Sequence, residues 1–142
     1  MRGTLVDLPR TVARSGEVFQ TAGVADRVAT VAQSFFEPLP AGADVYLLKS
    51  ILGDWPDREA AVILRRCADA ARPSSGRVVL LNGVSPDEAK GPSPALLMML
   101  LVGGKDRNLT EFRELARGAG LEVQTAERMK SGRFVVECRP LV

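Results

Sequence analysis

Short runs of apolar residues alternate along the chain with longer segments in which apolar residues recur at helical spacing. Four of the runs are typical of strands: residues 4–8 (TLVDL), 27–31 (RVATV), 44–49 (DVYLLK) and 77–81 (RVVLL). The last two are almost continuously apolar, as expected of parallel strands that are covered on both faces. Strands that alternate with helical segments predict an α/β fold built on a parallel sheet.

The helical segments differ in strength. The clearest covers residues 57–71, because its apolar residues share one helical face: Ala60, Ile63, Leu64, Cys67 and Ala71. A second helix should begin after Asn108, which with Glu111 matches the capping-box pattern. A weaker helix is predicted between the first two strands, where Gly16 interrupts the pattern.

The remaining segments predict loops, a buried helix and a hairpin. Residues 35–43 (FFEPLPAGA) carry two prolines and a glycine, and we expect a loop there. The run at 95–102 (ALLMMLLV) favours a short buried helix, since Leu and Met prefer helix to strand; it could also line an apolar pocket. Residues 122–125 and 133–139 predict a C-terminal β-hairpin with its turn at 130–132.

Composition narrows the class of protein without naming it. The 142 residues suffice for one domain, and 46% hydrophobic with 25% charged residues is typical of a globular chain. A formal net charge of +2, without a basic stripe, argues against nucleic acid as a partner. The N-terminus has no signal-peptide pattern, and the longest apolar run is far shorter than the about 20 residues that span a bilayer. We therefore expect a cytoplasmic protein without a membrane partner.

The chain contains no histidine. Histidine-based acid–base catalysis, nucleophile activation and metal binding are therefore excluded within this chain. Its two cysteines, Cys67 and Cys138, lie far apart and form no CxxC motif. We expect no metal site, and we interpret both as buried thiols in a reducing cytoplasm.

Asp7 is the strongest chemical signal that the residues give without further context. It ends the first predicted strand and precedes a helix, where an acidic residue of a nucleotide-binding sheet accepts hydrogen bonds from a ribose diol. A helix N-cap is an equally good interpretation of this position. The chain has no GxGxxG motif, so a phosphate-binding loop is not indicated.

Five segments, taken in order, resemble one family. They are LVDLPRTV at 5–12, DRVATVAQSFFEPLPAGADVYLLKSILGDWPD at 26–57, ILRRC at 63–67, GRVVLLNGV at 76–84 and GGKDRNLTEFRELARGAGLEV at 103–123. Together they closely resemble the C-terminal half of the S-adenosylmethionine-dependent small-molecule O-methyltransferases. This family includes the caffeic-acid-type plant enzymes and the actinobacterial enzymes of antibiotic and polyketide secondary metabolism.

The resemblance implies a Rossmann-like methyltransferase sheet that lacks its first strand and the glycine-rich loop after it, with a C-terminal β-hairpin. Residues 1–142 would form a single partial catalytic domain, without the N-terminal dimerisation domain of the family. The missing strand lies mid-sheet in the family, between those matching residues 4–8 and 44–49. Because its neighbours would lose hydrogen-bond partners, we expect stable folding to need an oligomer or a complementing methyltransferase subunit.

The resemblance also implies site residues for the methyl donor and for a small-molecule acceptor. Asp7 would hold the ribose hydroxyls of S-adenosylmethionine, Ser34 and Phe35 would lie along the adenine, and Lys49 would lie near the donor. Trp55, Met98 and Met99 would border the acceptor pocket. Without the resemblance, core packing is the preferred interpretation of the aromatic residues.

Four positions depart from the family pattern. Ser34 replaces an acidic residue at the adenine position, so a charge-assisted hydrogen bond is lost. Gly53 occupies the position of the histidine general base. Asn82 and Asp106 occupy the positions of the two carboxylates that orient this histidine. No catalytic residue is therefore assigned, since the loss of a general base typically lowers the rate by about 10²–10⁴-fold.

Three functions remain open at this point. The first is methyl transfer from S-adenosylmethionine to a hydroxyl of an aromatic or polyketide-like metabolite, impaired in this chain. The second is an inactive fragment or interaction partner from a truncated or split methyltransferase gene. The third is a changed reaction such as hydroxylation, because relatives in this family have lost the histidine and acquired other chemistry.

Overall fold

The computed structural model describes residues 1–88, 101 and 103–142. The chain divides into two compact units, Met1–Leu39 and Pro40–Val142, and each is described by itself. Their helices and strands give the chain a mixed α/β fold, as the alternation of apolar patterns predicts.

The first unit is a parallel β-α-β arrangement. Strand β1 (Gly3–Asp7) leads into helix α1 (Pro9–Thr21), and strand β2 (Val28–Ala32) pairs with β1 in parallel from Gly3↔Val28 to Asp7↔Ala32. The helix is the crossover that two parallel strands require. It begins at Pro9, whose fixed backbone angle suits a first turn, and it runs through Gly16 without a break.

The start of β2 differs from the prediction. The strand begins at Val28 rather than at Arg27 because the residues before it, Ala25–Arg27, form a short 3₁₀ helix, η1. The amide of Arg27 donates to the carbonyl of Val24 at 3.0 Å, so Arg27 closes the turn.

The second unit contains a four-stranded mixed sheet. Its strands are β3 (Val45–Lys49), β4 (Arg77–Leu81), β5 (Leu121–Arg128) and β6 (Phe134–Pro140), in the order β3-β4-β6-β5. β3 and β4 are parallel, whereas β6 is antiparallel to both of its neighbours. The predicted C-terminal hairpin is therefore confirmed. β5 is longer than predicted, because pairing continues past a register shift to Arg128↔Phe134.

The two long helices of this unit agree with the prediction. α2 covers Asp57–Ala71, and α4 covers Leu109–Gly118. The capping box of α4 is complete: the amide of Glu111 donates to the Asn108 side chain at 2.9 Å, and the amide of Asn108 donates to the Glu111 carboxylate at 3.1 Å. Two short 3₁₀ helices, η2 (Leu52–Asp54) and η3 (Arg72–Ser74), flank α2.

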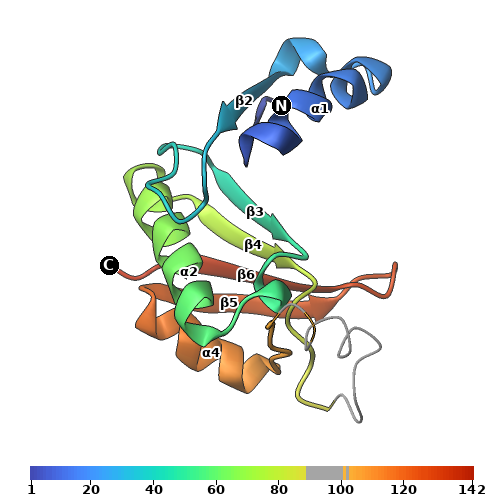
Figure 1. Ribbon diagram of the computed structural model, residues 1–142. Helices are drawn as coiled ribbons and strands as arrows, with labels where there is room; N and C mark the ends of the chain where they lie inside the picture. The colour runs from blue at the N-terminus through green and yellow to red at the C-terminus, as the bar shows by residue number, and fades with distance from the viewer. Residues whose placement is uncertain (89–100, 102) are drawn as a thin grey trace. The chain divides into compact units, whose positions relative to one another are not determined.

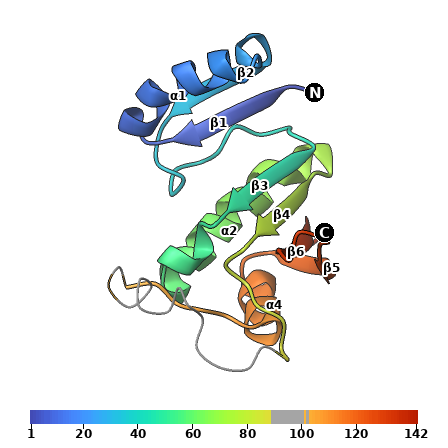
Figure 2. The same cartoon turned by 90° about the vertical axis from the view of Figure 1, so that its right-hand side faces the viewer.

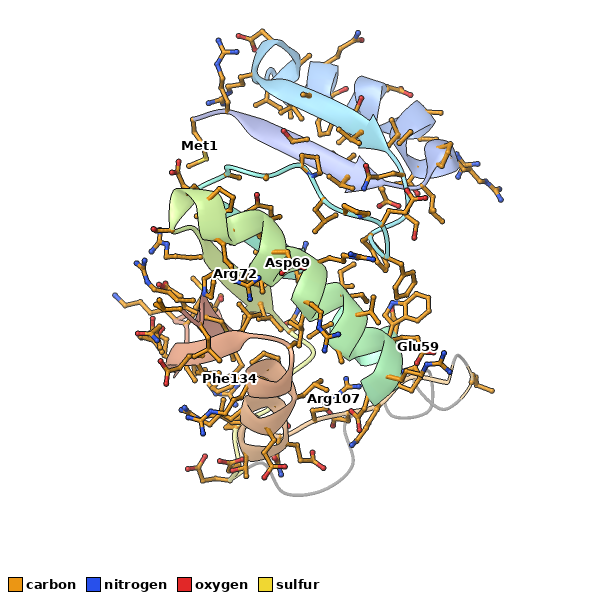
Figure 3. All side chains as sticks on the ribbon, turned by 90° about the vertical axis from the view of Figure 1, so that its left-hand side faces the viewer. Met1, Glu59, Asp69, Arg72, Arg107 and Phe134 are labelled. Carbon is orange, nitrogen blue, oxygen red and sulfur yellow. The ribbon has the colours of Figure 1, made fainter. Side chains whose placement is uncertain are left out.

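Helices α2 and α4 cover the same face of this sheet (Figures 1 and 3). Their apolar residues and the strand residues that face them form the core. The fully buried members with the largest side chains include Ile63, Leu64, Val78, Leu80, Phe112, Leu121 and Val136.

The face of β3 opposite to α2 points toward the viewer in Figure 2, where α2 lies behind the strand. Val45 and Leu47 project from this face and are 42% and 56% exposed. The expectation that β3 is covered on both faces is therefore wrong for the described residues. The physical reason is that, among the described residues, the helix packed against β3 is α2, which lies on one face only.

The segment at 95–102 lies outside the described residues except for Leu101, which is exposed. Met98 and Met99 are among the residues that are not described. Among the helices that are described, none is long and apolar enough to cross a membrane.

Cys67 and Cys138 should not react with a thiol reagent while the protein is folded. Both are free and buried, and burial raises the pKa of each thiol to about 12. The reactive thiolate is therefore scarce at neutral pH. Titration with Ellman's reagent at pH 8 should find neither thiol in buffer and both in denaturant. Rapid labelling in buffer, with secondary structure intact by circular dichroism, would contradict this placement.

Candidate functional site

The carboxyl ends of β3 and β4 carry an unusual pair of backbone conformations. Ser50 and Asn82 directly follow the two strands, and both have positive φ, at 54° and 63°. The side-chain Nδ2 of Asn82 donates to the Ser50 hydroxyl at 3.2 Å. Left-handed conformations in residues other than glycine are costly, and they concentrate at functional sites. In open α/β sheets, ligands bind just beyond the carboxyl ends of the strands.

Gly53 lies shortly after the carboxyl end of β3, in the turn formed by residues 52–55 (the 52–55 turn). It is buried, and two other glycines approach its backbone. A Cβ on Gly104 would overlap the Gly53 carbonyl oxygen, and a Cβ on Gly83 would lie 3.3 Å from the Gly53 nitrogen. The amide of Lys105 donates to the Gly53 carbonyl at 3.2 Å. Three loops thus meet at backbone distance around Gly53.

Arg107 joins these loops through its side chain, which is only 1% exposed. Its Nη1 donates to the carbonyls of Leu52 at 3.0 Å and Lys105 at 3.2 Å. Its Nη2 donates to the carbonyl of Trp55 at 2.8 Å, and its Nε donates to the Asp57 carboxylate at 2.8 Å. The guanidinium therefore satisfies backbone acceptors on both sides of Gly53. Figure 3 shows Arg107 beside the first turn of α2.

Asp57 is the first residue of α2 and the acidic partner of this network. It also accepts from Lys105 Nζ at 2.8 Å, so its two oxygens bind two cations. The Lys105 ammonium, followed by the Arg107 guanidinium, holds the pKa of Asp57 below its usual value of 3.8 against the opposing effect of burial. A carboxylate in the first turn of a helix also interacts favourably with the helix dipole.

The loop after β4 is attached to the same centre. The amide and hydroxyl of Ser85 donate to the Arg107 carbonyl at 2.9 and 3.2 Å. The Asp87 carboxylate accepts from the Thr110 amide and hydroxyl, both at 2.9 Å, at the start of α4. These bonds place the loop that follows Asn82 against the segment that carries Asp106.

In the first unit, three predicted donor-site residues lie at the carboxyl ends of β1 and β2. Asp7 is half-buried, and its carbonyl accepts from the amide of Gln33 at 3.0 Å. Ser34 follows Gln33, and its hydroxyl accepts from the Phe36 amide at 3.2 Å. The rings of Phe35 and Phe36 are 5.2 Å apart and tilted by 58°.

The geometry does not favour the N-cap interpretation of Asp7. The N-cap residue of α1 is Leu8, and no side chain caps this helix end. The Asp7 carboxylate instead accepts from the adjacent Leu8 amide at 2.7 Å. A half-buried carboxylate at the carboxyl end of a parallel strand remains able to bind a ligand hydroxyl.

The other predicted residues lie in the second unit. Lys49 is exposed at the end of β3, Trp55 is half-buried, and Asp106 is half-buried between Lys105 and Arg107 in the sequence. Gly53, Asn82 and Asp106 belong to the three connected loops. In the described ranges, no group of three or more histidine, cysteine or acidic residues could hold a metal ion.

Sequence reasoning missed Arg107, Asp57 and Ser50. Arg107 and Asp57 are separated by 50 residues, and no spacing rule links a helix N-terminus to a distant arginine. Ser50 shows no signal because its positive φ depends on the strand geometry around it.

A sequence profile of the O-methyltransferase domain matches residues 1–122. The chain belongs to the O-methyltransferase domain family. It is 44% identical over 126 residues to the 2,7-dihydroxy-5-methyl-1-naphthoate 7-O-methyltransferase of Streptomyces carzinostaticus, a match that covers 89% of this chain. It is also 40% identical, over 85% of its length, to the aclacinomycin 10-hydroxylase RdmB of Streptomyces purpurascens.

A solved O-methyltransferase from neocarzinostatin biosynthesis, NcsB1, has the same fold over 99% of this chain, with a TM-score of 0.88 and 40% identity. That structure contains S-adenosylmethionine and 2-hydroxy-5-methyl naphthoic acid. The present chain spans 42% of that structure and 38% of the naphthoate methyltransferase. The family and fold of this chain are thus established, but the chain corresponds to less than half of the length of each of these relatives.

The ion pairs of Asp57 should make the unfolding free energy depend on pH. A carboxyl whose folded-state pKa is depressed stabilises the protein above its unfolded pKa, and this stability is lost as the pH falls through the folded value. Urea unfolding between about pH 5 and pH 2 should therefore show a smaller decline for Asp57→Asn than for the parent chain. The effect should be modest, because Asp57 is half-exposed and water screens the pair.

Lys105→Met tests the cause of this pKa shift. It removes the cation that contributes most, so the Asp57 carboxyl should titrate at a higher pH in this variant. Carboxyl-carbon NMR would measure both midpoints. A parent midpoint at or above 3.8 would contradict the network.

Proposed function

We propose that the chain is part of an S-adenosylmethionine-dependent O-methyltransferase that acts on a hydroxyl group of a small aromatic or polyketide-like metabolite. The observation that carries this proposal is the family match over residues 1–122. Relatives of similar sequence are named for methyl transfer to naphthoate and mitomycin compounds. The two free buried thiols fit a reducing cytoplasm as the place of action.

The carboxyl ends of β1 and β2 have the chemistry for the adenosine part of the donor. The carboxylate of Asp7 can accept two hydroxyl hydrogens, as a ribose diol requires. The Phe35 ring offers an apolar face to an adenine, and the Ser34 hydroxyl can exchange hydrogen bonds with it. The donor, when bound, supplies a methyl group on a sulfonium. Lys49 is assigned to the surroundings of the donor by the family resemblance.

Trp55, Met98 and Met99 are proposed to border the acceptor pocket. Trp55 lies on the 52–55 turn, next to the position of the family base. Gly53 offers no group that can take a proton, and Asn82 is an amide that cannot act as a base. Asp106 retains an acidic group. We therefore expect slow transfer to alcohols and ordinary phenols, and faster transfer only to acceptors that are already ionised.

A second function is favoured by one specific observation. RdmB, which is 40% identical to this chain, is named as a hydroxylase rather than as a methyltransferase. The absence of histidine at position 53 removes the proton acceptor of the methyl-transfer reaction, so a changed reaction on a similar acceptor is the runner-up. An inactive fragment or interaction partner from a split methyltransferase gene is the third possibility.

We further propose that the described strands belong to a Rossmann-like methyltransferase sheet. In the described residues, β1 pairs only with β2, and the four-stranded sheet ends at β3. Val45 and Leu47 are exposed on one face of this edge strand. Unpaired edges with apolar side chains favour association with another chain. A second copy or a complementing methyltransferase subunit would cover them.

Titration calorimetry with S-adenosylmethionine and S-adenosylhomocysteine tests donor binding. We expect micromolar affinity, about −8 kcal/mol. Asp7→Asn should weaken it about tenfold or more, because charge-assisted hydrogen bonds contribute roughly 1.5–3 kcal/mol. Asp26→Asn is the matched control: it removes one carboxylate from an exposed position of the same unit.

Two outcomes would contradict donor binding at Asp7. The absence of heat from folded protein would mean that the chain does not hold the donor by itself. An equal loss of affinity in Asp7→Asn and Asp26→Asn would mean that net charge, and not a contact with Asp7, governs binding.

Association through the β3 edge should be visible in solution. We expect the chain to sediment as an oligomer at micromolar concentration, or to melt broadly as a monomer. Val45→Lys should weaken self-association, because a charge on an edge strand opposes strand addition. Val62→Lys, on α2 and 36% exposed, should leave it unchanged. A monomer that melts in one sharp cooperative transition would contradict the need for a partner.

A further inference from the structure

We propose that Arg107 is the positioning residue of the 52–55 turn, which fixes the backbone at the family's base position and holds Trp55 in place. What the turn does rests on the proposed function, whereas its dependence on Arg107 does not. The position of Arg107 in the sequence does not indicate that it acts on Gly53. This role is inferred from the four hydrogen bonds that its buried guanidinium donates.

The hydrogen bonds from Arg107 reach the chain on both sides of Gly53. Arg107 donates to the carbonyls of Leu52 and Trp55, so the chain is held on both sides of Gly53 and Asp54. The Gly53 carbonyl itself accepts from the amide of Lys105 at 3.2 Å. The local backbone hydrogen bonds of the turn run from the Asp54 amide to the Ile51 carbonyl at 3.1 Å and from the Trp55 amide to the Leu52 carbonyl at 3.2 Å. Most acceptors of the turn are thus satisfied from the 105–107 segment.

Arginine is suited to this task for a geometric reason. Its planar group presents donors in several fixed directions, and here they serve three carbonyls and one carboxylate. Lysine keeps the charge but offers a single ammonium with three donors. Its donors share one nitrogen, so they cannot reproduce the arrangement in which two separate nitrogens of Arg107 serve the carbonyls of Leu52 and Trp55. Arg107→Lys therefore removes this pair of hydrogen bonds and retains the positive charge.

Burial makes the turn and the guanidinium depend on each other. If the 52–55 turn opened, Arg107 would lose two of its acceptors while remaining out of water, which is strongly unfavourable for a charged group. The Arg107 carbonyl is bound by Ser85 from the third loop. One residue therefore links the segments that carry Gly53, Asn82 and Asp106.

Amide hydrogen exchange tests this role directly, because the amides of Asp54, Trp55 and Lys105 are all hydrogen-bonded. In Arg107→Lys, we expect their exchange to rise about tenfold or more relative to the core amides of Leu80 and Val136. Trp55 is the only tryptophan, so its emission should also shift and become more accessible to acrylamide. Arg117→Lys is the matched control at a site that is 76% exposed, and it should change neither.

A milder pair of variants keeps the test valid if Arg107→Lys does not fold. Asp57→Asn removes only the charged partner of Arg107, and it should increase the same exchange rates by a smaller factor. Asp69→Asn is its control: Asp69 lies on the same helix, is 50% exposed against 51% for Asp57, and pairs with Arg72. It should leave Trp55 and the three amides unchanged.

Uniformly faster exchange in the turn and in the core would mean that Arg107 only stabilises the fold. Unchanged exchange in the turn would mean that the hydrogen bonds from Arg107 do not hold the turn. Either result would overturn the proposal. The affinity for S-adenosylhomocysteine, measured on the same variants, should be equal in Arg107→Lys and the parent. A parent chain that binds no donor would refute the proposed function without affecting the exchange result.

Discussion

A buried guanidinium is the interaction on which the arrangement of the loops at the carboxyl ends of β3 and β4 depends. Arg107 is 1% exposed, and Asp57, its acidic partner among the described residues, is itself half-exposed. One carboxylate cannot replace the hydration of a buried cation by itself, and the remaining compensation comes from the carbonyls of three loop residues. The loops must therefore keep these positions for the charge to remain buried.

Backbone packing imposes the second constraint on the same place. Gly104 and Gly83 approach Gly53 so closely that a side chain on Gly104 could not be accommodated. Hydrogen bonds from Arg107 and Lys105 can reach the 52–55 turn because the main chains come this near. The electrostatic and steric requirements thus support each other: the glycines allow the approach, and the cation makes it favourable.

Local patterns predicted much of the fold, and long-range contacts account for what they missed. The bounds of α2 and the capping box of α4 follow from apolar spacing and from Asn108 with Glu111, which are properties of short segments. The face of β3 that is exposed among the described residues could not be foreseen, because apolar composition does not show which faces of a strand helices will cover. Gly53, Asn82 and Asp106 were known only as isolated positions. Their connection depends on Arg107 and Asp57, which are 50 residues apart.

If Gly53 occupies the base position, as the family resemblance implies, the missing base and the loop framework around it have separate physical consequences. General-base assistance is typically worth about 10²–10⁴ in rate, whereas holding two reactants in line can contribute far more. The framework around Gly53 is held by Arg107 and by backbone contacts, none of which requires a side chain at position 53. Under the proposed function, such a framework would orient an acceptor without deprotonating it. Its chemistry would then be decided by the acidity of the acceptor, and an acceptor that is already an anion would need no histidine.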